Sequence, residues 1–69
     1  MINVIKLKAS IASNGLTVNE VADKLGIDRS TFYRKLQHGG GSFTIDQARA
    51  LGQILNLQFE DVTGIFFAH

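Results

Sequence analysis

The stretch LTVNEVADKLGIDRSTFYRKL, residues 16–36, decides the fold of this 69-residue chain. Apolar residues recur every three or four positions on both sides of Gly26, which is the pattern of two short amphipathic helices. Gly26 marks the turn between them, because glycine adopts the positive φ of a tight turn at little cost. We therefore predict a helix pair that meets at a steep angle.

Local signals set the ends of these two helices. Thr17 and Glu20 are spaced as a capping box, in which each side chain bonds the backbone amide of the other residue. Asp28 is placed to cap the second helix, which we expect over residues 29–37. The expected scaffold comprises Val18, Val21, Ala22, Leu25, Gly26, Ile27, Phe32 and Leu36. The opposite side of the second helix is polar and comprises Arg29, Ser30, Tyr33, Arg34 and Gln37. A short helix that presents long polar side chains in this way suits the DNA major groove.

The residues before and after the pair predict three further helices. The first is capped by Asn3 and ends at Asn14-Gly15. Residues 38–42 form a glycine-rich loop by composition, and the capping box of Thr44 and Gln47 then starts a fourth helix. Its expected inward residues are Ile45, Ala48, Leu51, Gly52 and Leu55, and a short fifth helix covers roughly 59–67. Since no strand alternation is evident, we predict one all-α, five-helix domain over residues 1–69.

Charge and composition narrow the class of partner. The net charge is only +1, but the charged residues from Arg29 to Ile45 are all basic, namely Arg29, Arg34 and Lys35. A basic face on a near-neutral domain indicates a nucleic-acid partner. No apolar run approaches the ~20 residues of a membrane span, and lysines interrupt the N-terminal stretch, which excludes a signal peptide. With no cysteine, the composition fits a cytoplasmic protein without a membrane partner.

The remaining polar features are structural rather than catalytic. Glu60 and Asp61 fall in the first turn of a helix, where acids stabilise the helix dipole. The triple glycine at 39–41 lacks the lysine of a phosphate-binding loop, and no nucleophile-base pair, metal set or cofactor motif is visible. We therefore expect no enzyme activity, no cofactor, no metal and no small-molecule ligand.

The run Val21-Ala22-Asp23-Lys24-Leu25-Gly26-Ile27 and its spacing to Phe32 and Leu36 carry a family resemblance. The segment 17–37 resembles the helix-turn-helix of the lambda-repressor-like, Cro/C1-type (XRE) family, and the five-helix plan extends the likeness over nearly the whole chain. The run Ser-Thr-Phe-Tyr-Arg-Lys-Leu, followed by a glycine-rich loop and Phe-Thr-Ile, is similar to small phage or prophage regulators. The resemblance implies a lambda-repressor-like DNA-binding fold with the motif at helices 2 and 3.

The resemblance also implies roles for individual residues. The third helix enters the major groove, and base contacts are expected from Arg29, Ser30, Thr31, Tyr33 and Arg34. Phosphate contacts, which set register rather than sequence, are expected from Thr17, Lys35, Gln37, His38, Gly39, Gly40 and Ser42. The family often has a glutamine that contacts phosphate and braces the recognition helix at the position of Val18, so this contact is either absent here or replaced by the Thr17 hydroxyl or a backbone amide at the helix start.

Function and assembly follow as expectations. The most direct reading is a small phage-type transcriptional repressor that occludes a pseudo-palindromic operator in double-stranded DNA. Ile65, Phe66 and Phe67 cannot all face one small core, so we expect one or two of them to be buried and the remainder to contact a second copy in a homodimer. The alternative is a helix-turn-helix-derived protein-interaction module, either an antirepressor or a dimerisation unit, without specific DNA binding.

Overall fold

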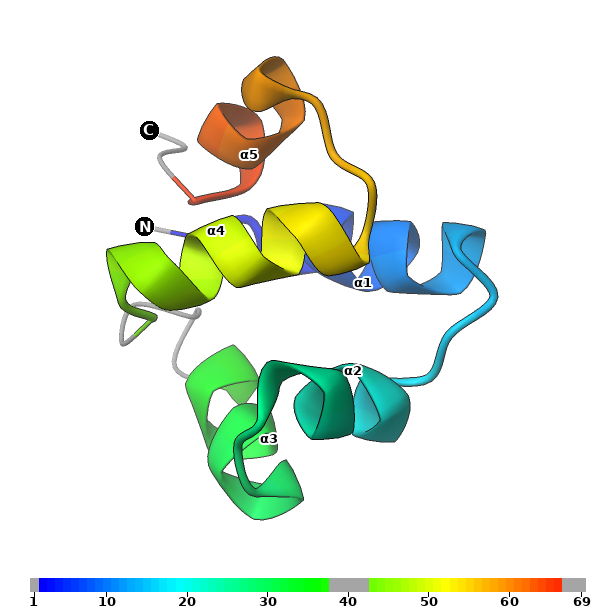
Figure 1. Cartoon of the computed structure of the whole chain (residues 1–69), viewed down its shortest axis with the longest axis vertical. Helices are drawn as coiled ribbons and strands as arrows, with labels where there is room; N and C mark the ends of the chain where they lie inside the picture. Colours follow the sequence, from blue (N-terminus) through cyan, green and yellow to red (C-terminus); the bar gives the residue numbers. More distant parts are fainter. Residues whose placement is uncertain (1, 38–42, 67–69) are drawn as a thin grey trace.

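The computed structural model describes residues 2–37 and 43–66, which contain five helices and no strand. The helices are α1 (Val4–Ser13), α2 (Val18–Leu25), α3 (Arg29–Gln37), α4 (Ile45–Ile54) and α5 (Phe59–Phe66). Helices α1 and α4 cross the middle of the molecule, with α5 on one side of them and the pair α2–α3 on the other (Figure 1). The predicted all-α, five-helix fold is therefore confirmed.

Capping bonds start the helices where the sequence predicts. The Glu20 amide donates to Thr17 Oγ1 at 3.1 Å and the Thr17 amide donates to Glu20 Oε1 at 2.9 Å, which completes the capping box of α2. Thr44 and Gln47 form the same pair of bonds at the start of α4, both at 3.0 Å. Each cap satisfies amides that have no partner within the helix. The expected capping boxes are confirmed.

The turn between α2 and α3 uses the left-handed conformation of Gly26. Its φ is +80°, and its amide bonds the carbonyl oxygens of Ala22 and Asp23 at the end of α2. The amide of Ile27 also donates to Ala22 O, at 3.1 Å. The chain thus changes direction within three residues, and α3 starts beside the end of α2.

The core is entirely apolar in the part of the chain that the structure describes. Its buried members are Leu7, Ile11, Val21, Ala22, Phe32, Leu36, Ala48, Leu51, Leu55, Ile65 and Phe66. Val18, Leu25 and Ile27, three of the predicted scaffold residues, are partly buried against this cluster. Every helix contributes at least two residues to the cluster, so no helix packs independently of the others.

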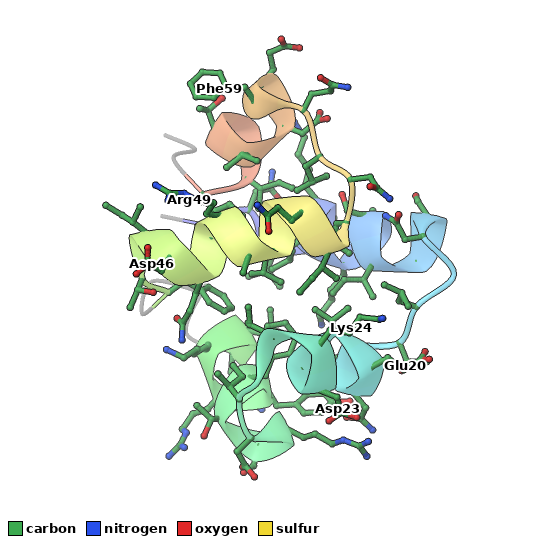
Figure 2. The ribbon with its side chains drawn as sticks, viewed as in Figure 1. Glu20, Asp23, Lys24, Asp46, Arg49 and Phe59 are labelled. Carbon is green, nitrogen blue, oxygen red and sulfur yellow. The ribbon has the colours of Figure 1, made fainter. Side chains whose placement is uncertain are left out.

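One predicted core residue lies elsewhere. Ile45 is 72% exposed, so its expected inward position is wrong. It is the first residue of α4, and the first turn of that helix extends beyond the helices packed against it (Figure 2). The inward side of α4 instead begins at Ala48, which is 7% exposed. Helical spacing identifies a side of a helix, but it does not show how far along the helix the neighbouring helices reach.

The ends of α1 and α4 are joined by an asparagine. The Asn14 side-chain amide donates to Ser10 O at 2.8 Å in its own helix and to Leu55 O at 3.0 Å at the end of α4. Two helix C-termini thus share one donor group, which satisfies carbonyl oxygens that lack intrahelical partners.

Within residues 2–37 and 43–66, no helix is long and apolar enough to cross a membrane.

Candidate nucleic-acid interface

Helix α3 has one buried side and one exposed polar side. Phe32 is fully buried and Leu36 is 6% exposed, which fixes the inward side of the helix. The exposed residues are Arg29, Ser30, Tyr33, Arg34 and Gln37. The predicted division of α3 into scaffold and outward residues therefore agrees with the observed burial.

Three aromatic rings connect α3 to the far end of the chain. The rings of Phe32 and Phe43 meet edge to face with their centroids 5.7 Å apart, and Phe43 meets Phe66 of α5 in the same manner at 6.0 Å. Edge-to-face pairs of this kind add to the stabilisation that comes from burial alone. The packing role of Phe43 was not predicted from the sequence, because a lone phenylalanine after a glycine-rich loop has no helical pattern around it. The ring series holds α3 against the core from the side opposite to its polar face.

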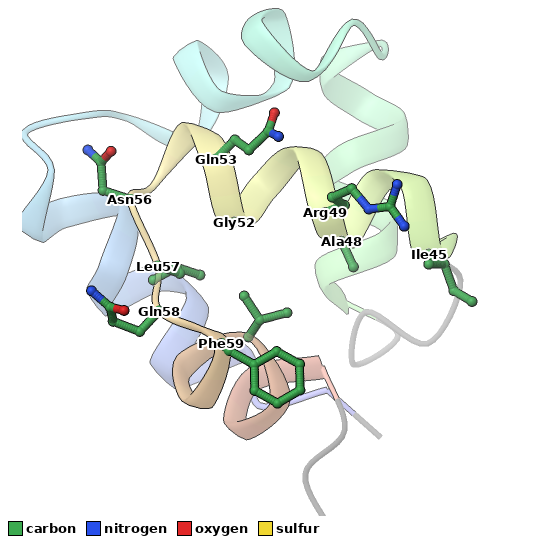
Figure 3. A pocket seen from close by; sticks show the side chains of 10 residues that line it. Ile45, Ala48, Arg49, Gly52, Gln53, Asn56, Leu57, Gln58 and Phe59 are labelled. Atoms are coloured by element: carbon green, nitrogen blue, oxygen red, sulfur yellow. The ribbon is translucent and has the colours of Figure 1, made fainter.

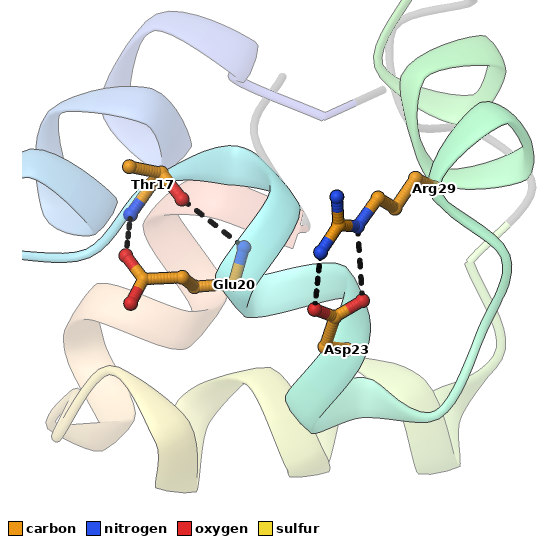
Figure 4. Close-up of polar contacts among 4 residues, drawn as sticks. All are labelled: Thr17, Glu20, Asp23 and Arg29. Atoms are coloured by element: carbon orange, nitrogen blue, oxygen red, sulfur yellow. Dashed lines mark hydrogen bonds and ion pairs between the residues drawn. The ribbon is translucent and has the colours of Figure 1, made fainter.

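The predicted base-contacting residue Arg29 is bonded to Asp23 of α2. Arg29 Nη2 lies 2.7 Å from Asp23 Oδ2 and Nε lies 3.1 Å from Oδ1, which makes a bidentate ion pair across the turn (Figure 4). Both side chains remain about half exposed, at 55% and 54%. The hydrogen bond from Arg29, aided by its charge, holds the pKa of the Asp23 carboxyl below its usual range. The bond to Asp23 likewise raises the pKa of Arg29.

Asp23 was not predicted from the sequence to be part of this site. The available signal was an acid six residues before an arginine, on the other side of a glycine turn. Such a separation lies outside the three- and four-residue pairs that a single helix brings together. Only the turn of the chain at Gly26 makes the two side chains neighbours.

Asp28 caps α3 and also bonds Ser30. Its carboxylate accepts a hydrogen bond from the Ser30 amide at 3.2 Å and another from the Ser30 hydroxyl. The Ser30 hydroxyl bond, followed by bonds from the backbone amides of Thr31 and Ser30, lowers the pKa of Asp28 below its ordinary value despite partial desolvation. Because the hydroxyl hydrogen of Ser30 is engaged with Asp28, its oxygen is left to act as an acceptor toward any further partner.

Arg34 and Thr31 form a second polar pair on the same helix. Arg34 Nη2 lies 3.3 Å from Thr31 Oγ1, one turn before it. Arg34 is exposed and Thr31 is partly buried, while Tyr33 beside them is 46% exposed. The five residues expected to contact bases are thus all on α3, and four of them are exposed.

The residues expected to contact phosphate are more dispersed. The Thr17 oxygen accepts the Glu20 amide at the start of α2, and Gln37 is exposed at the end of α3. Lys35 is partly buried, with Nζ 5.5 Å from the centroid of the Phe43 ring, and therefore lies toward the aromatic series. The other four predicted residues, His38, Gly39, Gly40 and Ser42, lie outside the described residues.

The electrostatic character of the site is nearly balanced. Between residues 17 and 37 the chain carries four basic and three acidic side chains. Two of those acids, Asp23 and Asp28, lie against the polar side of α3, although both are absent from the all-basic run that begins at Arg29. Attraction to the phosphate backbone is therefore modest, and directed contacts must contribute a large share of any binding energy.

The C-terminal residues expected at a dimer contact lie mainly in the core. Ile65 is 2% exposed and Phe66 is 7% exposed, and the Asn3 amide donates to Ile65 O at 2.8 Å. The expected burial of one or two of the three C-terminal residues is therefore met by Ile65 and Phe66, and the dimer contact expected of the remaining residue stays a prediction. Phe67 lies outside the described residues.

A groove of about 800 Å³ lies between α4 and α5, whereas α2 packs against the other side of α4 (Figure 3). Its floor is at Gly52, where a Cβ atom would meet Val62 Cγ2 at 3.1 Å. Arg49 and the 79% exposed Phe59 form part of its rim (Figure 3).

Among the described residues, no group of three or more His, Asp or Glu side chains is arranged to hold a metal ion.

Comparison with known proteins agrees with this geometry at the level of the motif. The family model of the Fis family of bacterial regulatory proteins matches residues 6–38, which include α2, α3 and most of α1. No curated protein and no solved structure matches the chain. The match identifies a helix-turn-helix of the kind found in DNA-binding regulators, and it does not support the narrower Cro/C1 type.

Proposed function

We propose that this chain binds double-stranded DNA sequence-specifically, with α3 in the major groove, and represses transcription by occluding an operator. The observation that carries the proposal is the exposed polar side of a helix whose other side is anchored by Phe32 and Leu36 in the core. Base contacts need side chains that start from a fixed position, because the groups of a binding site must be held within roughly 0.5 Å of their productive geometry.

Each outward residue has a role that its chemistry supports. Arg29 and Arg34 donate to guanine O6 and N7, and the Ser30 oxygen accepts from a cytosine or adenine amino group. Tyr33 and the methyl group of Thr31 contact a thymine methyl or the sugar-phosphate backbone. The predicted phosphate contacts are Thr17, Lys35, Gln37, His38, Gly39, Gly40 and Ser42.

Assembly and family type belong to the same proposal. The five-helix plan supports the likeness to Cro/C1-type phage regulators, because α4 and α5 extend beyond the residues matched by the Fis family. A homodimer would place two copies of α3 in successive major grooves ~34 Å apart on a pseudo-palindromic site. Sedimentation tests this part separately: a monomer at high concentration, both free and on DNA, would contradict the dimer.

The experiment starts from a randomised duplex library, since the operator is unknown. Selected duplexes are then titrated by fluorescence anisotropy at two salt concentrations. We expect one family of sequences, bound with an affinity that falls as salt rises. Arg29→Ala should lose discrimination at one base pair, whereas Lys35→Ala should weaken binding to all sequences alike.

Arg49→Ala is the matched control, because it removes the same charge beside the α4–α5 groove, away from α3 (Figure 2). It should leave both discrimination and the salt dependence unchanged. If Arg29→Ala and Arg34→Ala together leave specific affinity intact, the proposed recognition face is wrong. If the library yields no preferred sequence, the chain is better described as a protein-interaction module.

A further inference from the structure

We infer that Asp23 is a positioning residue, which holds the Arg29 guanidinium so that its free end faces a guanine. The inference rests on the proposed function, because it assigns a role within the same DNA contact. The carboxylate comes from the last turn of α2, six residues before the arginine.

The donor geometry of Arg29 supports this role. A guanidinium has five N–H groups in a fixed plane. Asp23 accepts from Nε at 3.1 Å and from Nη2 at 2.7 Å, which uses the lateral edge of the plane. The two hydrogens on Nη1 and the second hydrogen on Nη2 remain free of Asp23. One N–H of Nη1 and the remaining N–H of Nη2 are parallel at the end of the group, and this pair matches the O6 and N7 acceptors of guanine. The ion pair therefore orients the guanidinium without using the donors that a base needs.

Both partners start from fixed backbone positions. Asp23 follows directly on Val21 and Ala22, which are fully buried, and α2 is held at its start by the capping box. Arg29 lies in the first turn of α3, three residues before the fully buried Phe32. A long side chain that is already ordered loses less rotamer freedom when it meets the base.

The charges of Asp23 and Arg29 allow a positioning role to be distinguished from simple attraction of Arg29 to the DNA phosphates. A carboxylate on a DNA-facing surface repels phosphates, and its pairing with Arg29 cancels one of the few positive charges of this face. The pair thus contributes little to sequence-independent affinity. Removing the Asp23 charge should raise binding to unrelated DNA while it reduces discrimination at the base that Arg29 contacts. A residue with a purely structural role would not move these two quantities in opposite directions.

The test measures base discrimination in wild type, Asp23→Asn, Arg29→Ala and the double variant. Each protein is titrated against four duplexes that differ only at the base pair where Arg29→Ala loses its preference, and against an unrelated duplex. We expect Asp23→Asn to lower the preference about 3- to 10-fold, part of the roughly 5- to 150-fold that one bidentate contact supplies. In the Arg29→Ala background the same change should have no further effect on preference.

Glu60→Gln is the control, because it removes an equal charge from the exposed first turn of α5. It should leave the base preference unchanged. Asp23→Ala removes the carboxylate in a second way and should lower the preference as Asp23→Asn does. Thermal unfolding checks that every variant is folded. If Asp23→Asn lowers the preference by the same factor in the Arg29→Ala background as in the wild type, the inference is overturned. It is also overturned if Asp23→Asn alone leaves the preference unchanged. A wild-type protein that prefers no sequence would refute the proposed function itself, and this outcome is distinct from the other two.

Discussion

Replacement of Gly26 by alanine tests whether the turn between α2 and α3 is limited by backbone conformation alone. Gly26 has a φ of +80°, and a Cβ atom built on it meets no heavy atom within 4 Å. The substitution therefore creates no steric clash with the rest of the fold. Its cost is that of placing an L-residue in the left-handed region, roughly 1–2 kcal/mol, partly offset by the lower entropy of the unfolded alanine chain.

The expected net loss in the free energy of unfolding is about 1 kcal/mol. A chain of 69 residues has a stability of roughly 3–10 kcal/mol, so the variant should remain folded at 25 °C. For a domain of this size, such a loss lowers the melting temperature by about 4–8 °C. Thermal and urea unfolding, followed by circular dichroism, measure both quantities.

Gly26→Asn is the matched comparison, because asparagine tolerates the left-handed conformation better than alanine does. It should lose less stability than Gly26→Ala, and both variants should keep wild-type DNA affinity well below their melting temperatures. The reasoning is refuted if alanine is as stable as glycine or if asparagine is as damaging as alanine. A loss above about 3 kcal/mol would equally refute it, because it would require a steric clash that the open space around Gly26 excludes.

Three further substitutions follow from the described contacts. Phe32→Ala empties a fully buried site and should cost about 3–5 kcal/mol in urea unfolding, whereas Tyr33→Ala, at a 46% exposed neighbour, should stay within about 0.5 kcal/mol. Thr17→Ala breaks the capping box and should lower the free energy of unfolding by about 1 kcal/mol, as measured by thermal unfolding. Thr17→Ser keeps the hydroxyl and should therefore retain most of this stabilisation. Because Arg29 lowers the pKa of Asp23 from 3.8, their ion pair stabilises the fold above that pH and is lost as the pH falls through the folded-state pKa. Asp23→Asn should therefore flatten the decline of the urea midpoint below about pH 4, and an unchanged decline would contradict this.

The parts of the fold that the sequence predicts correctly depend on short separations along the chain. Thr17 with Glu20 and Thr44 with Gln47 are three residues apart, and their bonds form whatever lies around the helix. The turn at Gly26 is likewise a local backbone preference. Helical spacing then identifies the buried side of α3, because the separation of four residues between Phe32 and Leu36 fixes their relative direction.

The features that sequence reasoning missed depend on separations that no local rule covers. Asn14 bonds Leu55 O across 41 residues, and Phe43 joins rings from α3 and α5. The pairing of Asp23 with Arg29 requires the three-dimensional course of the turn, although the two residues are close in sequence. The exposed position of Ile45 depends on where other helices end, which a periodic pattern within α4 does not contain.

The series of rings through Phe32, Phe43 and Phe66 limits how far the helix-turn-helix can be treated as a transplantable module. The family match ends at residue 38, before two of those three rings. Helices of 8 and 9 residues, such as α2 and α3, are marginal in water on their own. A peptide cut from residues 16–37 should therefore show little helix by circular dichroism, and a graft of this motif into another protein needs a substitute for the two missing rings. The segment proposed to contact DNA is continuous in sequence, but the unit that must be moved with it includes all five helices.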